Sequence, residues 1–321
     1  KLKLDALLNA YNALSASANV DRGMITLVDT ALVPSQPTSP NHLRNMVLAV
    51  FAGIGLAGAF AFIREFADDR IRSVAAVEER LGIPVLGQTP SINADELDSA
   101  GNNQFSALIE SYASIKSTVE FSIPRDKNVI QITSSQSGEG KSTTAWIVAE
   151  LFARLGRRTL LIDADMRRPS IGSLIDGPTN EMGFAEVLLG HAEMQDVLIK
   201  SVHDNLDILT MGNIPSNPVE ILSSHELARF IEAQRREYSM VIFDSPPVIG
   251  LADSPLIAQR VDATVFVIEA NKVRLGQAKA AIKRLHANGA NLIGVVLTKF
   301  VPERVGESYG YGYDYYSYGK D

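Results

Sequence analysis

The sequence predicts an α/β domain with a mostly parallel sheet flanked by helices, preceded by one transmembrane helix. From residue 105 onward, short apolar runs such as VIQIT (129–133) and TLLID (159–163) alternate with longer helical patterns, which is typical of parallel strands buried on both faces. Similar runs follow at 206–210, 240–244, 263–269 and 292–298. Upstream, residues 46–63 contain no charge and no proline, which predicts the transmembrane helix.

Composition excludes several classes of protein. The chain has 321 residues, of which 46% are hydrophobic and 21% are charged, so most of it is expected to fold. Its formal net charge of -7 provides no general basic field, and nucleic acid is therefore not an expected partner. Because the chain has no cysteine, it has no disulfide, no thiol nucleophile and no cysteinyl metal site.

The apolar run at 46–63 has the length of a membrane span. Its 18 residues would extend roughly 27 Å as a helix, close to the thickness of a bilayer's hydrocarbon core. A buried core helix is the alternative, but the run has no polar face and is bracketed by Arg44 and Arg64, which favours the membrane. The expected organisation is an N-terminal region at 1–43, a transmembrane helix at 44–64, a linker at 65–104, a folded domain at 105–300 and a flexible tail at 301–321.

Residues 134–143, SSQSGEGKST, form a P-loop between a predicted strand and a predicted helix. They follow the pattern G-x-x-x-x-G-K-[ST], with Ser135 in place of the first glycine. The backbone N–H groups of such a loop bind phosphate oxygens, its lysine reaches the β- and γ-phosphates, and its serine can bind Mg²⁺. The expected nucleotide-binding residues are Gly138, Glu139, Gly140, Lys141, Ser142 and Thr143.

Carboxylates stand at the ends of two predicted strands. Asp163 and Asp165 follow one strand, and Asp244 ends another. The C-terminal ends of parallel strands meet at one edge of a sheet, where such sheets bind ligands. A single aspartate there is usually a helix cap or a turn residue, but three of them in one sheet with a P-loop favour a role beside the phosphates.

This set of motifs is similar to the Walker A, A′ and B motifs of bacterial tyrosine kinases, which are the cytoplasmic domains of polysaccharide co-polymerases. The A′ counterpart reads DADMRRP (163–169), and the B counterpart reads DSPP (244–247). Residues 212–222, GNIPSNPVEIL, resemble a further segment of that family. The upstream prolines and apolar span also follow its pattern, so the resemblance covers nearly the whole chain. The family's C-terminal tyrosine cluster corresponds to Tyr309, Tyr311, Tyr313, Tyr315, Tyr316 and Tyr318.

The resemblance implies a P-loop NTPase fold, with ATP and Mg²⁺ as cofactors. Lys141 would stabilise the charge of the transferred phosphate, and Asp165 would orient or deprotonate the acceptor hydroxyl. Ser142 and Asp163 would hold Mg²⁺, and Asp244 would position the ion through water. The implied catalytic residues are Lys141, Asp163 and Asp165, and the implied metal-binding residues are Ser142, Asp163 and Asp244.

The resemblance further implies a tyrosine autokinase that phosphorylates its C-terminal tyrosines in trans, within a ring of subunits. Its cellular role would be to regulate the polymerisation and export of capsule or exopolysaccharide. The implied partners are neighbouring subunits, the polysaccharide polymerase, the outer-membrane export channel, a tyrosine phosphatase and membrane lipid. The protein would lie in the bacterial inner membrane, with residues 1–43 periplasmic and the kinase domain cytoplasmic.

Two departures from the family pattern concern assembly and base recognition. The helix that usually carries E-x-x-R-x-x-R has Glu110, Ala113 and Lys116 instead, and a lysine offers a point charge without the guanidinium fork. These positions are expected to lie along one side of a helix. Thr298 and Lys299 end the last strand, where relatives often have an asparagine beside the adenine.

Alternatives to a kinase stay open on the sequence alone. A P-loop switch would use ATP binding only to gate oligomer assembly, and it would need no acceptor tyrosines. A structural co-polymerase with a vestigial site would not need the motif residues, which are all present. Arg167 and Arg168 also have two interpretations, because each could neutralise phosphate charge or merely cover a surface.

Overall fold

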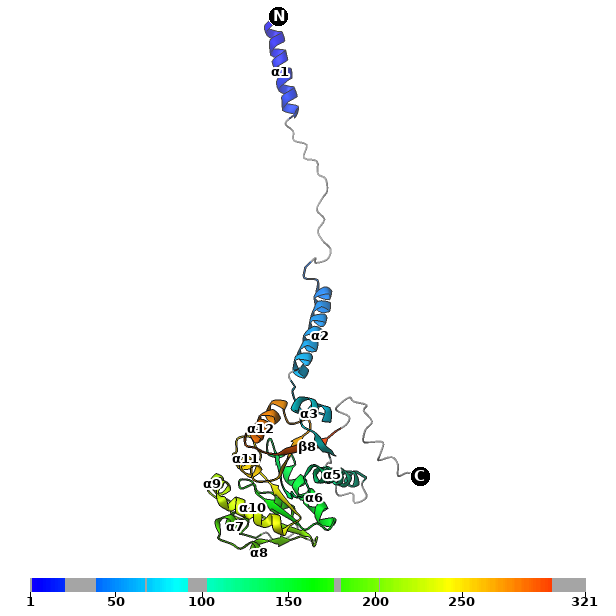
Figure 1. The fold of residues 1–321 in the computed structure, drawn as a ribbon. Helices are drawn as coiled ribbons and strands as arrows, with labels where there is room; N and C mark the ends of the chain where they lie inside the picture. Colours follow the sequence, from blue (N-terminus) through cyan, green and yellow to red (C-terminus); the bar gives the residue numbers. More distant parts are fainter. Residues whose placement is uncertain are drawn as a thin grey trace, which may run out of the picture. The chain divides into compact units, whose positions relative to one another are not determined.

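The computed structural model divides into two units, residues 1–65 and residues 66–321 (Figure 1). The structure describes residues 2–20, 39–66, 68–91, 103–175, 180–201 and 203–301.

The first unit contains the helices α1 (Leu2–Val20) and α2 (His42–Phe66). In α2, residues His42–Arg64 have a mean hydropathy of 2.4 over an 18-residue window, and none of that window is buried. Among the described residues, α2 is the one helix that is long and apolar enough to cross a membrane. Its exposed apolar side chains suit a hydrocarbon environment better than water.

The second unit is built on an eight-stranded sheet with the order β1-β8-β7-β2-β6-β3-β5-β4. Its strands are β1 (Val85–Pro90), β2 (Val129–Ser134), β3 (Thr159–Asp163), β4 (Ile199–Lys200), β5 (Leu206–Leu209), β6 (Met240–Asp244), β7 (Ala263–Glu269) and β8 (Leu292–Phe300). All neighbouring strands run parallel except β4, which is antiparallel to β5. The predicted parallel sheet is confirmed, because the apolar runs form its central strands.

Helices cover both faces of this sheet, and alternate residues of each strand therefore enter different cores. Leu161 and Ile242 pack in a cluster with α5 (Asn103–Ser122) and α6 (Lys141–Arg154), whereas Leu160 and Val241 pack in a second cluster on the other face. The remaining helices are α3 (Val74–Leu81), α7 (Phe184–Leu189), α8 (Met194–Val197), α9 (Pro218–Ser223), α10 (His225–Glu237), α11 (Asp253–Ala258) and α12 (Leu275–Ala287), with the short 3-10 helix η1 (Ile171–Leu174). Burial on both sides explains why the strands are continuously apolar.

Residues 68–91 differ from the linker expected over 65–104, because they are part of the folded unit. β1 forms an edge strand parallel to β8. Upstream of it, the Ile71 N–H donates to the Val273 carbonyl at 2.9 Å, and the side chains of Ile71 and Val77 are buried against α12. Their burial supplies the hydrophobic free energy that fixes this segment on the sheet.

We predict that a chain beginning at residue 105 is much less stable than one beginning at Phe66. The shorter chain loses β1 and the side chains of Ile71, Val77 and Leu86, and each buried side chain of this kind contributes about 1.5–3 kcal/mol. Urea unfolding of both chains at equal concentration measures the difference. Equal transition midpoints would show that residues 66–104 contribute nothing to the fold.

Candidate active site

The site lies where the adjacent strands β2, β6 and β3 end, at the carboxyl edge of the sheet. The P-loop leads from β2 into α6, which begins at Lys141. Gly140 precedes it with a φ of 91°, a left-handed conformation that suits glycine. A Cβ atom at Gly140 would lie 3.5 Å from the methyl carbon of Thr298, an ordinary contact, so the positive φ and not lack of space makes a side chain unfavourable there. The loop can therefore turn sharply and present Lys141 to the strand ends.

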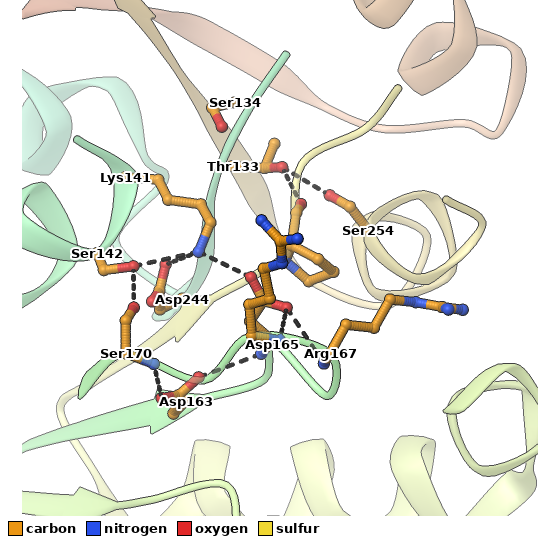
Figure 2. A network of polar contacts seen from close by, with 12 residues as sticks. Thr133, Ser134, Lys141, Ser142, Asp163, Asp165, Arg167, Ser170, Asp244 and Ser254 are labelled. Atoms are coloured by element: carbon orange, nitrogen blue, oxygen red, sulfur yellow. Dashed lines mark hydrogen bonds and ion pairs between the residues drawn. The ribbon is translucent and has the colours of Figure 1, made fainter. Parts of the chain in front are cut away.

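The Lys141 ammonium group joins the ends of β3 and β6 (Figure 2). Its Nζ lies 3.0 Å from Asp165 Oδ2 and 3.5 Å from Asp244 Oδ1, and it donates to Ser142 Oγ at 3.1 Å. The structure thus brings together four residues that the sequence places in three separate motifs. Such close pairing offsets the cost of burying these charges at the end of a sheet.

Asp163 has a different surrounding from Asp165. Its Oδ2 accepts hydrogen bonds from the backbone N–H groups of Ser170 and Ile171, both at 2.9 Å, and its Oδ1 accepts from the Asp165 N–H at 3.2 Å. Asp163 therefore shapes the loop that connects β3 to η1. Ser170 also donates from its Oγ to Ser142 Oγ at 2.7 Å. No sequence motif pointed to Ser170, because its contact with the P-loop depends on the fold of this loop.

Asp244 has a buried oxygen without a protein partner. Its side chain is fully buried, and Oδ2 has no hydrogen-bond partner among the described residues. An unpaired carboxylate oxygen beside Ser142 and Asp163 suits Mg²⁺ or its bound water, since Mg²⁺ takes oxygen ligands and keeps several waters. Within the described ranges, no three His, Asp or Glu side chains gather as a metal cluster.

The charges at this site are strongly perturbed by burial. Burial, together with the nearby charges of Asp163 and Asp165, raises the pKa of Asp244 to about 7 against the opposing charge of Lys141. Burial likewise raises the pKa of Asp163 to about 6, although its backbone donors favour the charged form. Burial alone would lower the pKa of Lys141, but Asp244 and Asp165 outweigh it and raise that pKa overall. The site therefore retains protons more readily than exposed carboxylates do.

Glu139 supports the P-loop through its side chain, which the sequence did not indicate. The carboxylate is buried, accepts from Ser135 Oγ, and also accepts from the backbone N–H groups of Gln136 at 2.5 Å and Ser135 at 3.4 Å. Burial raises the pKa of Glu139 to about 7. Ser135, which replaces the usual glycine, thus has a partner inside the loop. Of the other predicted nucleotide-binding positions, Gly138 has a φ of 84° and Thr143 is exposed in the first turn of α6.

Lys116 and Thr298, the two departures from the expected family pattern, have internal partners. Lys116 is buried, pairs with Glu120 on α5, and lies 4.8 Å above the centre of the Phe152 ring. The Lys116 ammonium group is therefore paired within its own domain. Thr298 donates from Oγ1 to the Glu139 carbonyl at 2.7 Å, so it supports the P-loop.

We predict that the nucleotide-free protein beginning at Phe66 becomes less stable as the pH rises from about 4.5 to 7.5. The folded state keeps protons on Asp163, Asp244 and Glu139 with pKa values of about 6, 7 and 7, whereas the unfolded chain releases them near pH 4. Because the folded state binds more protons than the unfolded state in this pH range, the free energy of unfolding falls as the pH rises. The expected fall between the two pH values is more than about 1 kcal/mol. Urea unfolding at both pH values measures this fall in stability, and Asp244→Asn is expected to reduce it. A flat or rising stability would contradict the assigned pKa shifts.

Comparison with protein families identifies both units. A family model described as an AAA domain matches residues 127–283, and one described as a G-rich domain on tyrosine kinases matches residues 4–66. The solved structure of the BceF tyrosine kinase domain is similar with a TM-score of 0.63 and 27% identity, covering 71% of this chain and 98% of that one.

Similar curated proteins are bacterial tyrosine kinases. The chain is 38% identical to the tyrosine-protein kinase YwqD of Bacillus subtilis over 189 residues, covering 59% of this chain and 79% of that protein. It is 28% identical to the tyrosine-protein kinase ptk of Acinetobacter johnsonii over 305 residues, covering 91% of this chain and 42% of that protein. The chain thus spans less than half the length of the curated relatives that match nearly all of it. By the similarity to YwqD and the matching fold, the chain belongs to the family of bacterial tyrosine-protein kinases.

Proposed function

We propose that the protein is an ATP- and Mg²⁺-dependent tyrosine autokinase. The observation that carries the proposal is the placement of Lys141 Nζ beside a P-loop, at 3.0 Å from Asp165 and 3.5 Å from Asp244. Phosphoryl transfer depends mainly on positioning and on neutralising charge, and this arrangement supplies a cation and carboxylates at one point. Membership of the tyrosine kinase family supports tyrosine as the acceptor.

Each residue has a distinct part in this proposal. The P-loop from Gly138 to Thr143 binds the phosphates of ATP, and Lys141 stabilises the charge on the transferred group. Ser142 and Asp163 would hold Mg²⁺, Asp244 would position it through water, and the ion would neutralise phosphate charge. In the structure, Asp165 is paired with Lys141. If Lys141 pairs with phosphate oxygens instead, the Asp165 carboxylate is free to orient the tyrosine hydroxyl and accept its proton.

The proposed acceptors are the tyrosines of the C-terminal tail. Tyr309, Tyr311, Tyr313, Tyr315, Tyr316 and Tyr318 lie outside the described residues. In the sequence they follow β8, which ends at Phe300. In the sheet, β7 separates β8 from β2, the strand that leads into the P-loop. We propose transfer in trans, with the tail of one subunit reaching the site of a neighbour in a ring. Phosphorylation adds about -1.5 to -2 charges per tyrosine and would favour dissociation of an acidic ring.

The cellular setting is also proposed from the family and from α2. We propose that α2 anchors the protein in the bacterial inner membrane, with residues 1–43 periplasmic and the kinase unit in the cytoplasm, where ATP is available. The kinase would regulate the polymerisation and export of capsule or exopolysaccharide. The polysaccharide polymerase, the outer-membrane export channel and a tyrosine phosphatase would be its partners.

We predict that Lys141→Met lowers phosphotyrosine formation at least about a hundredfold, because the missing cation acts on the charge that develops during transfer. The measurement is incorporation of ³²P from γ-labelled ATP, with thermal unfolding as a check of the fold. Lys279→Met, which removes an exposed lysine of α12, is the matched control and should label like the wild type. Undiminished labelling of folded Lys141→Met would refute the site assignment.

Transfer in trans makes a separate prediction. A full chain carrying Lys141→Met is mixed with a chain that has an intact site but ends at Val301, before the tyrosine cluster. We expect ³²P on the tyrosines of the Lys141→Met chain, because it alone offers acceptors. If wild-type protein labels itself but the Lys141→Met chain stays unlabelled in the mixture, transfer in trans is refuted and transfer must occur in cis.

A further inference from the structure

A bidentate ion pair lies beside the proposed active site and is not part of the chemistry described so far. Arg167 donates from Nε to Asp253 Oδ2 at 2.8 Å and from its terminal nitrogen to Asp253 Oδ1 at 3.1 Å. The Asp253 side chain is completely buried, whereas 39% of the Arg167 side chain is exposed. In Figure 2 the Arg167 side chain extends away from Lys141. Arg167 therefore faces its carboxylate partner and not the phosphate site.

The pair joins two loops that are far apart in the sequence. Arg167 belongs to the loop after β3, and Asp253 is the first residue of α11, which follows the β6 loop. Planar two-bond pairing fixes the orientation as well as the distance of the two groups. A buried carboxylate also needs a counter-charge, because an unpaired charge in the interior is strongly destabilising. The loop after β3 is thus held to α11 at a defined angle.

The start of α11 is itself fastened to the strand that leads into the P-loop. Ser254 donates from Oγ to Thr133 Oγ1 at 2.8 Å, and Thr133 donates to the Pro246 carbonyl at 2.7 Å (Figure 2). Gln131 donates from Nε2 to the Ser254 carbonyl at 3.2 Å. All of these side chains except the Pro246 ring are polar and deeply buried, so their hydrogen bonds define one arrangement of β2 and α11.

The other end of the pair leads directly to Asp165. The Asp165 Oδ1 accepts from the backbone N–H groups of Arg167 at 3.3 Å and Arg168 at 3.0 Å, while its Oδ2 faces Lys141 at 3.0 Å. A shift of the Arg167 backbone would therefore rotate the Asp165 carboxylate. The contacts form a closed path from β2 through Ser254, Asp253, Arg167 and Asp165 to Lys141, which begins the helix after the P-loop.

We propose that Arg167 and Asp253 are a positioning pair for phosphoryl transfer, which fastens the loop after β3 to α11 and thereby holds the Asp165 carboxylate in place against Lys141. The kinetic consequence rests on the proposed kinase function, whereas the fastening of the loop does not. In this role Arg167 neither neutralises phosphate charge nor merely covers a surface. Its guanidinium group is bound to Asp253, and it affects the reaction through Asp165.

The test compares full-length variants of the pair with a matched surface variant. Arg167→Lys keeps the charge but cannot form the two-bond fork, Arg167→Gln removes the charge, and Asp253→Asn removes the other partner. The double variant Arg167→Gln/Asp253→Asn leaves no unpaired buried charge. The control is Arg229→Gln, because Arg229 forms an ion pair with Glu226 on the exposed side of α10.

Three quantities are measured for each variant: the affinity for ADP·Mg²⁺, the rate of phosphotyrosine formation at saturating ATP, and the amide exchange of peptides covering 164–170. For Arg167→Lys we expect nucleotide affinity within about twofold of the wild type and a kcat about ten- to a hundredfold lower, since small misplacements of a reacting group have effects of this size. Exchange should rise in 164–170 and not in α6. The double variant should be no slower than the slower single variant, because the two residues act as a unit.

Some outcomes would overturn the proposal. If Arg167→Lys and Asp253→Asn transfer phosphate as fast as Arg229→Gln, the pair does not position Asp165. If nucleotide affinity falls in parallel with kcat, the pair supports the whole site and not Asp165. If Arg167→Gln does not fold, Arg167→Lys and Asp253→Asn decide the question.

Failure of the proposed function gives a different result. Wild-type protein that forms no phosphotyrosine would refute the kinase assignment, and the exchange measurement would then decide the positioning pair alone. Faster exchange of 164–170 in Arg167→Lys than in Arg229→Gln supports the fastening of the loop, and equal exchange overturns it.

Discussion

The burial of one ammonium group, that of Lys141, organises the carboxyl edge of the sheet in this protein. A lysine is seldom buried unless its charge is paired, and here Asp165 and Asp244 provide the pairing from two different strands. The three side chains can meet only if the P-loop turns at Gly140 and if β2, β6 and β3 end at the same level. The sheet order, the loop conformation and the positions of the carboxylates are therefore linked through a single cation.

The same cluster indicates how the site could accept phosphate. Asp165 and Asp244 neutralise Lys141, and burial raises the pKa of Asp244 and of Asp163, so negative charge at this site is costly. In the proposed function, Lys141 would pair with phosphate oxygens instead, and Ser142, Asp163 and Asp244 would hold Mg²⁺, which neutralises phosphate charge. The unpaired Asp244 Oδ2 and the Ser142 hydroxyl lie at the place where this exchange would occur.

Support for the site comes from buried polar groups on several elements. Glu139 holds the first half of the P-loop from within, Thr298 fastens its second half to β8, and Asp163 folds the loop after β3. Arg167 and Asp253 then connect that loop to α11. The Thr298 and Arg167 contacts join segments far apart in the sequence, whereas those of Glu139 and Asp163 fold their own loops, and together they limit the freedom of the side chains at this edge of the sheet.

The amino-acid sequence by itself determined the class of the fold, because continuously apolar runs between helical patterns can be buried only in a covered parallel sheet. It also indicated the P-loop and the aspartates at the ends of β3 and β6, since their positions follow from local motifs and from strand direction. It failed at residues 68–91, where a short edge strand and single buried residues such as Ile71 carry too little local pattern to distinguish them from a linker. It could not predict that Asp163 binds backbone while Asp165 faces Lys141, that Glu139 and Lys116 are satisfied internally, or that Arg167 pairs with Asp253. The Lys141–Asp165 and Arg167–Asp253 pairs depend on distances between residues far apart in the chain. The partners of Asp163, Glu139 and Lys116 are near in sequence, but which of the possible partners each one takes depends on loop conformation and burial, which tertiary packing sets.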